Sequence, residues 1–160
     1  MKKKNTEKNF LIISRNKRAK YNTYIKKEME AGLSLKGWEV KSLRSNNISI
    51  STSYVTLKSS SAYLTGAVFQ SNTNNNMNFI YEKERNIQLL LHKHEINSLF
   101  GYVKIKGYSI VVISLYWKYH KAKLKIGIAK GKKKIDKRLE IKKREWEIKK
   151  SRLFKKNKIY

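Results

Sequence analysis

Residues 109–129 read SIVVISLYWKYHKAKLKIGIA, and this stretch decides the expected fold class. Its two halves, 109–116 and 122–129, are rich in β-branched and aromatic residues, and the second half alternates polar and apolar side chains around Leu124. Alternation with a period of two is typical of a strand that is buried on one face only. The connection at 118–121 is polar and short enough for a hairpin. The stretch therefore predicts two neighbouring antiparallel strands, in which Leu124 and Ile126 point inward while Lys123 and Lys125 point outward.

Other segments of similar composition extend the pattern along the chain. Those expected to be strands are 33–43, 54–58, 62–66 and 101–105. The connections at 58–61 and 106–107 are short and polar, which favours hairpins over crossover helices. We therefore expect a mainly β protein whose antiparallel sheet forms a closed or nearly closed barrel.

Three segments depart from the strand pattern. Residues 22–31 have a helix-forming composition that stops at Gly32, since glycine readily adopts the positive φ that ends a helix. In 92–100, apolar side chains at helical spacing predict a short helix over one end of the barrel. The asparagine-rich segment 72–78 has no periodicity and a strong turn preference, so we expect a mobile loop there.

The composition limits both the class of protein and the class of partner. The chain has 160 residues, no cysteine, 38 Lys plus Arg and 11 Asp plus Glu, which leaves a net charge of +27. The absence of cysteine excludes disulfide scaffolds and thiolate zinc sites, and the apolar runs are too short for a transmembrane helix or a secretion signal. We therefore expect a cytoplasmic protein that binds a polyanion and has no membrane partner.

The charge is concentrated towards the C-terminus. Residues 130–160 hold 15 basic and 4 acidic side chains, against 23 and 7 in residues 1–129. The segment 135–154 favours helix, but its apolar side chains fall on two narrow lines among lysines and arginines, so a free helix would bury little surface. Three regions are expected: a flexible basic N-terminus at 1–15, a barrel at 16–130, and a tail at 131–160 that is disordered when free and helical on a polyanion.

No feature of the sequence points to catalysis, a cofactor or a metal ion. The segment 127–133, GIAKGKK, has three residues between its glycines where the Walker pattern needs four, and a lysine where that pattern needs a hydroxyl. His92 and His94 would need a third ligand to hold zinc. Simpler interpretations are a glycine-hinged basic exit from the last strand and the start of a helix at which Glu95 complements the dipole.

Aromatic side chains are expected in two environments. In a small barrel most of them lie in the core, which is our interpretation of Tyr54, Tyr63, Tyr108 and Tyr116. The candidates for stacking on unpaired bases lie beside basic residues, at Tyr21, Trp117 and Trp146.

Several local motifs are more specific than composition. In chain order they are NKRAK (16–20), EAG (30–32), GWEVKSLR (37–44), SYV (53–55), LLLH (89–92), GIAKGKK (127–133) and DKR (136–138). Over about residues 16–154 the chain resembles the SmpB family, the tmRNA-binding proteins of bacterial trans-translation. The resemblance implies an OB-fold-like barrel with flanking helices and a basic C-terminal tail that becomes helical on the ribosome.

The resemblance also implies a function and partners. Such a protein binds the tRNA-like domain of tmRNA, supports its delivery as alanyl-tmRNA with elongation factor Tu and GTP, and brings it to stalled 70S ribosomes for rescue and peptide tagging. Its tail lies in the 16S rRNA decoding centre and the empty mRNA channel. The alternative is a general RNA chaperone or ribosomal protein, which would share the charge and the barrel but would not prefer one folded RNA.

The same resemblance implies site residues. Contacts to tmRNA are expected at Asn16, Lys17, Arg18, Glu30, Leu90, His92 and Lys123, with further basic contacts at Lys93, Lys125 and Lys130. Contacts of the tail to the ribosome are expected at Gly131, Lys132, Lys133, Asp136, Lys137, Arg138, Lys142, Arg144, Trp146, Lys149, Arg152, Leu153 and Phe154. The family commonly has histidine where Tyr21 stands and an aromatic residue where Thr23 stands, so contacts made there in the family are not carried over.

Overall fold

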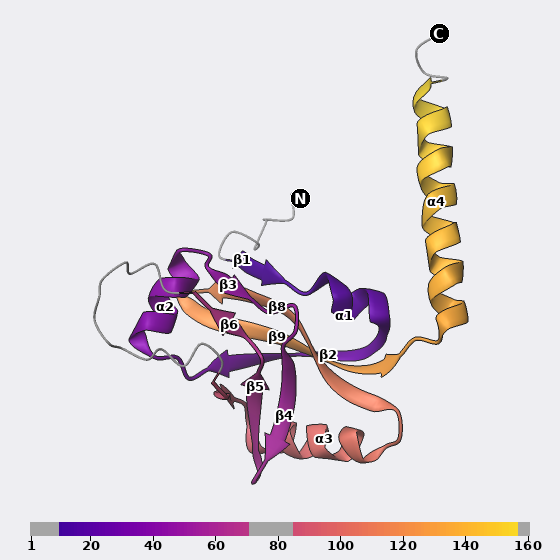
Figure 1. The fold of residues 1–160 in the computed structure, drawn as a ribbon. Helices are drawn as coiled ribbons and strands as arrows, with labels where there is room; N and C mark the ends of the chain where they lie inside the picture. The colour runs from indigo at the N-terminus through magenta and orange to yellow at the C-terminus, as the bar shows by residue number, and fades with distance from the viewer. Residues whose placement is uncertain (1–9, 71–84, 157–160) are drawn as a thin grey trace, which may run out of the picture.

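The structure, a computed structural model, describes residues 10–70 and 85–156. Its elements are β1 (Phe10–Arg15), α1 (Lys17–Asn22), β2 (Thr23–Leu33), α2 (Gly37–Arg44), β3 (Ile48–Ser49), β4 (Tyr54–Lys58), β5 (Ser61–Thr65), β6 (Val68–Phe69), β7 (Ile87–Leu90), α3 (Lys93–Lys104), β8 (Tyr108–Lys118), β9 (Lys121–Gly131) and α4 (Lys134–Lys156) (Figure 1). The asparagine-rich segment 72–78 lies outside the described residues.

The strands are joined by a ring of hydrogen bonds. In the main sheet the strand order is β1-β8-β4-β5-β7-β2-β9, and β9 also pairs with β8, so the sheet closes on itself. The pairings are antiparallel, and β3 and β6 form a separate short pair. The expected antiparallel sheet with flanking helices is therefore confirmed.

The interior of this ring is apolar. Leu124 and Ile126 of β9 are 0% and 1% exposed, and α3 adds the fully buried Leu99. Lys123 and Lys125 alternate with the two buried residues and are partly exposed on the outer side. Burial of each large aliphatic side chain stabilises the fold by about 1.5–3 kcal/mol. The alternation of period two thus predicted the inner and outer faces of β9 correctly.

Two of the three expected tight connections are hairpin turns. Ser59 and Ser60, between β4 and β5, and Tyr119 and His120, between β8 and β9, all have positive φ. Positive φ at both central residues is the geometry of the two-residue turns that match strand twist. The connection at 106–107 instead joins α3 to β8.

The segment expected to be a helix at 22–31 is strand β2. Residues from Thr23 to Gly32 pair with β9 from Gly131 back to Lys123. Pairing over this length satisfies the backbone hydrogen bonds of both strands, and this tertiary term outweighs the helix propensity of the local composition.

Two segments expected to be strands are helical. Within 33–43, helix α2 begins at Gly37, and its start is stabilised because Glu39 Oε2 accepts a hydrogen bond from the Lys36 backbone N–H at 2.6 Å. Residues 101–104 continue α3 beyond the expected end at Phe100, and Tyr102 packs against the core from this last turn. The strand-like composition of these two segments therefore predicted the wrong structure.

Both boundaries of the expected barrel move outward. Phe10–Arg15, part of the N-terminus expected to be flexible, form β1 and pair with β8. At the other end Gly131 pairs with Thr23, and the Lys132 N–H donates a hydrogen bond to the Asn22 carbonyl at 2.9 Å. Strand pairing therefore begins at Phe10 and reaches Gly131.

The expected core aromatics are only partly in the core. Tyr116 is 1% exposed, whereas Tyr54 is 51% exposed, so its assignment to the core was wrong. Tyr54 lies at the start of β4 with its side chain outside, since the next residue, Val55, is the one that joins the core. Tyr63 and Tyr108 are half-buried.

Candidate RNA interface

The four central RNA-contact residues implied by the family resemblance come from β2, β7, β9 and the start of α3. Gly32 of β2 pairs with Lys123 of β9 and with Leu90 of β7. Residues paired across adjacent strands point to the same face of the sheet. A Cβ atom at Gly32 would lie only 3.1 Å from Leu90 Cβ, so glycine leaves the space that Leu90 occupies. Lys123 and Leu90 therefore flank one surface, which Glu30 shares because it lies two residues before Gly32.

Glu30 is the centre of a hydrogen-bonded cluster on this surface. Its Oε2 accepts a hydrogen bond from the Tyr116 hydroxyl at 2.6 Å, and Lys118 Nζ donates to Oε2 and Oε1 at 3.0 and 3.3 Å. Lys123 Nζ lies 3.6 Å from Oε1. The Glu30 side chain is 34% exposed, so it is held from the protein side and is open to solvent on the other. We name Glu30, Tyr116, Lys118 and Lys123 the Glu30 cluster.

The charge states within the Glu30 cluster are fixed by its contacts. Burial raises the pKa of Tyr116, and the hydrogen bond to the Glu30 carboxylate raises it further, so the phenol stays a neutral donor. Desolvation acts to raise the pKa of Glu30, but hydrogen bonds from Tyr116 and Lys118 and the charges of Lys118 and Lys123 outweigh it and lower the pKa overall. Glu30 is therefore an anion at neutral pH.

Lys125 lies opposite Glu30 in the register of β2 and β9, on the same outer face, but forms an ion pair with a different carboxylate. Lys125 Nζ lies 3.1 Å from Glu28 Oε2, and both side chains are well exposed. Glu28 and Glu30 are two residues apart on strand β2, so they share one face.

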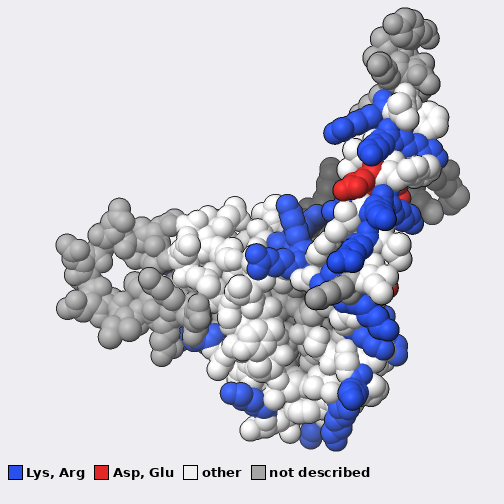
Figure 2. All heavy atoms as spheres, turned by 45° about the vertical axis from the view of Figure 1, so that its right-hand side comes forward, with Lys and Arg blue, Asp and Glu red and all other residues white. Residues whose placement is uncertain are grey.

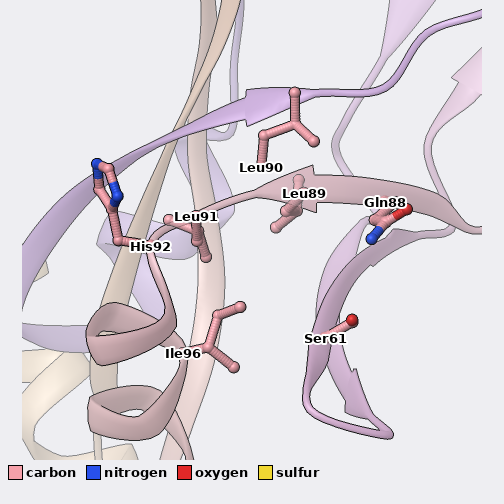
Figure 3. A pocket seen from close by; sticks show the side chains of 7 residues that line it. All are labelled: Ser61, Gln88, Leu89, Leu90, Leu91, His92 and Ile96. Carbon is pink, nitrogen blue, oxygen red and sulfur yellow. The ribbon is translucent and has the colours of Figure 1, made fainter.

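A shallow open pocket of about 330 Å³ lies beside Leu90. It is lined by residues of β5, β7 and the start of α3, namely Ser61, Gln88, Leu89, Leu90, Leu91, His92 and Ile96 (Figure 3). Figure 3 shows Leu90 and His92 pointing to one side of the chain, while Leu91 points towards Ile96 on the other. Leu90 is 57% exposed, and an exposed apolar side chain beside an imidazole suits contact with an unpaired base.

His92 and Lys93 stand at the start of α3. The Glu95 carboxylate accepts a hydrogen bond from the His92 backbone N–H at 2.8 Å, and the exposed rings of His92 and His94 stack at 5.5 Å. This confirms the interpretation of these residues as a helix start. Within the part of the chain that the structure describes, no group of three or more His, Cys, Asp or Glu side chains could hold a metal ion.

The basic segment at 16–18 lies at the opposite end of β2. Asn16 is 7% exposed, and its Oδ1 accepts a hydrogen bond from the Ala19 N–H at 3.2 Å as the N-cap of α1. Lys17 and Arg18 are exposed. With about 3.3 Å per strand residue, the path along β2 from Thr23 to Glu30 spans roughly 23 Å. The expected tmRNA contacts therefore form two surfaces on the body.

The tail starts beside α1. Asn22, the last residue of α1, accepts two hydrogen bonds from the start of the tail. Its carbonyl oxygen accepts one from the Lys132 N–H at 2.9 Å, and its Oδ1 accepts the other from Lys137 Nζ at 2.9 Å. Lys132 Nζ also donates to the Lys20 carbonyl at 3.2 Å, and Lys137 Nζ lies 5.9 Å from the centre of the Tyr21 ring. Tyr21 is thus part of the junction between body and tail.

Beyond this junction α4 stands away from the body (Figure 1). Asp136 caps its start, because Asp136 Oδ2 accepts a hydrogen bond from the Lys133 N–H at 3.1 Å. The remaining expected tail residues are exposed: Arg138, Lys142, Arg144, Trp146, Lys149, Arg152, Leu153 and Phe154. Figure 2 shows Lys and Arg side chains around α4 and down the adjoining side of the body. The helix thus presents positive charge in several directions and buries no broad apolar face.

No functional role was predicted from the sequence for three residues of these surfaces, namely Tyr116, Lys118 and Asn22. For Tyr116 only burial was predicted. Tyr116 pairs with Lys123 across β8 and β9, and this register brings its hydroxyl to Glu30. A local sequence pattern does not show how two strands are aligned, so the contact between Tyr116 and Glu30 could not be predicted from the sequence.

Among the described residues, no helix combines the length and apolar character needed to cross a membrane. In comparisons with known proteins, the family model described as SmpB protein matches residues 13–156. A solved structure described as "tmRNA-SmpB: a journey to the center of the bacterial ribosome" shares 34% sequence identity and has a TM-score of 0.59, over 76% of this chain and 85% of that one. The fold, the clustered motif residues and these matches lead to one conclusion: the chain belongs to the SmpB family, the non-enzymatic, tmRNA-binding proteins of trans-translation.

Proposed function

We propose that the outer face of β2, β7 and β9 contacts the tRNA-like domain of tmRNA. The observation that supports this proposal is the convergence of three distant parts of the sequence on one exposed surface: Glu30, the neighbouring Leu90 and His92, and Lys123. On this proposal the ring of strands is an OB-fold-like barrel, which recognises folded RNA by shape, sugar and phosphate contacts.

Basic side chains around this surface supply phosphate contacts. Lys93 and Lys125 adjoin the central residues, while Lys17, Arg18 and Lys130 lie towards the tail end of β2. Asn16 contributes by capping α1, which fixes the backbone that carries Lys17 and Arg18.

The tail acts at a later stage, on the ribosome. The protein delivers alanyl-tmRNA with elongation factor Tu and GTP to ribosomes stalled at a message end. Helix α4 then occupies the decoding centre and the empty mRNA channel, where 16S rRNA offers phosphates on several sides to the lysines and arginines of the helix.

Substitution of exposed leucines tests the proposed tmRNA face. Leu90→Glu places a negative charge beside the RNA and is expected to weaken binding of the isolated tRNA-like domain at least tenfold, which corresponds to about 1.4 kcal/mol. Leu11→Glu is the matched control, since Leu11 is 66% exposed on β1 and its side chain points to the opposite side of that strand from Phe10, the residue that covers Tyr116. Equal losses in both variants would contradict the assignment of the face.

The RNA that copurifies with the protein separates the two function classes. One abundant species a few hundred nucleotides long is expected for a tmRNA-binding protein. A mixture of ribosomal RNA fragments would favour a general RNA chaperone or a ribosomal protein.

A further inference from the structure

We infer that Tyr116 and Lys118 are positioning residues for tmRNA recognition, which act by holding the Glu30 carboxylate towards the RNA. The inference rests on the proposed function of the β2, β7 and β9 face. It adds to that function a support layer, contributed by β8, that no motif of the sequence indicates.

The Tyr116 ring is a rigid support. It is 1% exposed, and the Phe10 ring covers it with a centroid distance of 4.2 Å. A buried tyrosine has few torsions left free, and its hydroxyl needs a partner. Its partner is Glu30 at 2.6 Å, a short charge-assisted hydrogen bond, so the position of a partly exposed carboxylate is set by a fully buried ring.

Lys118 supports the same carboxylate from the solvent side. Its ammonium group contacts both Glu30 oxygens, at 3.0 and 3.3 Å, and its side chain is 42% exposed. With Tyr116 on Oε2 alone and Lys118 on both oxygens, the plane of the carboxylate is fixed. Lys123 Nζ, 3.6 Å from Oε1, is a third partner of the same carboxylate.

A carboxylate on an RNA-binding face can bind only particular RNA groups. It repels phosphates, which the many lysines of this chain attract, and it accepts hydrogen bonds from ribose 2′-hydroxyls and from base N–H groups. The RNA partner of Glu30 is therefore such a hydrogen-bond donor. A correctly placed Glu30 favours one RNA shape over other polyanions, because a donor must meet it where a phosphate would be repelled.

The experiment is a double-mutant cycle on binding of the isolated tRNA-like domain by the full-length protein. Tyr116→Phe removes only the hydroxyl and keeps the ring against Phe10, so we expect the dissociation constant to rise roughly three- to tenfold, the range for one lost hydrogen bond. Tyr54→Phe makes the same chemical change at an exposed ring on β4 and is expected to bind as the wild type does.

The decisive comparison is made in the Glu30→Ala background. If Tyr116 acts through Glu30, Tyr116→Phe causes no further loss there. Additive losses, or no loss from Tyr116→Phe alone, would overturn the inference. Unchanged binding by Glu30→Ala itself would instead contradict the proposed tmRNA face, so the two failures are distinct.

Lys118→Met provides a second cycle that does not touch the core. It is expected to weaken binding of the same RNA in the wild-type background and to have less effect beside Glu30→Ala. Equal effects in both backgrounds would show that Lys118 contacts RNA independently of Glu30 and would refute its positioning role, whether or not the Tyr116→Phe protein folds.

Discussion

At the scale of single residues, substitution of Lys123 is expected to affect tmRNA binding but not the stability of the fold. Its neighbours Leu124 and Ile126 are buried, whereas its own side chain is 29% exposed and makes one ion pair with Glu30. Exposed ion pairs contribute about 0–1 kcal/mol. Lys123→Ala should therefore weaken tmRNA binding several-fold and leave the melting temperature nearly unchanged.

The measurements for Lys123→Ala are filter binding and a thermal melt, with Lys104→Ala, an exposed lysine in the last turn of α3, as the control. A loss of melting temperature as large as that of a core truncation would mean that the faces of β9 were assigned backwards.

Glu30 makes stability depend on pH in a defined direction. Its pKa is lowered from 4.5 in the folded protein, so its contribution to the free energy of unfolding is present above about pH 4.5 and is lost as pH falls through the lower folded value. The Glu30→Gln protein lacks this term. The stability difference between wild type and Glu30→Gln, from urea unfolding, should be constant above about pH 5 and should shrink on further acidification. A difference that grows as pH falls would contradict the Glu30 cluster as described.

At the scale of elements, β9 depends on one glycine for its packing between β2 and β8. A Cβ atom at Gly127 would lie 2.8 Å from Ile113 Cδ1 and 3.1 Å from Ile25 Cγ2, so neighbouring aliphatic side chains would have to move. Gly127→Ala should lower the free energy of unfolding by about 1–3 kcal/mol, as overpacking of a core does. Gly131→Ala is the matched control, because a Cβ atom there would have no neighbour within 4 Å among the described residues. Equal losses of unfolding free energy in both variants, measured by denaturant unfolding, would argue against the tight packing of β9 between β2 and β8.

Helix α4 is the element that packs least against the rest of the protein. Its described side chains from residue 141 to residue 154 are exposed, and an isolated helix of this kind is marginal in water. We therefore predict that the free tail exchanges its amide hydrogens rapidly and that α4 is stabilised on the ribosome. Protected tail amides in the free protein would contradict this prediction.

Trp146 is expected to anchor the tail on the ribosome. Its ring is 60% exposed, with Lys150 Nζ 5.1 Å from the ring centre, and so it is available for stacking. Trp146→Ala should leave tmRNA affinity unchanged and should impair peptide tagging on ribosomes stalled at a message end. Ile148→Ala, on the other side of the helix, controls for loss of helix; undiminished tagging by Trp146→Ala would refute the anchor.

At the scale of the whole molecule, the body and tail are expected to act on different RNA surfaces. A chain that ends at Lys133 keeps the Gly131–Thr23 pairing and the Lys132–Asn22 hydrogen bond, and should still bind tmRNA but not support tagging. Its affinity should fall about three- to fivefold for each doubling of salt, which corresponds to roughly two to three phosphate contacts. Collapse of tmRNA binding on truncation, with the fold intact by circular dichroism, would place the tail in the tmRNA site.

The sequence by itself determined the class of partner, the strands β4, β5, β8 and β9, and the inner and outer faces of β9. These follow from quantities that are local, namely charge and the alternation of side chains over a few residues. The family motifs also named the expected contact residues, because each motif can be recognised without knowing where it lies in space.

The tertiary structure alone decided that residues 23–33 form a strand, and that Glu30, Lys123 and Leu90 lie on one surface. The first was wrong in the sequence analysis because the hydrogen bonds that hold β2 come from β9, about a hundred residues later in the chain. The second depends on strand register, which places Tyr116 and Lys118 of β8 against Glu30 of β2. Register is fixed when the ring of strands closes around its core, and a one-residue slip would turn these side chains to the opposite face.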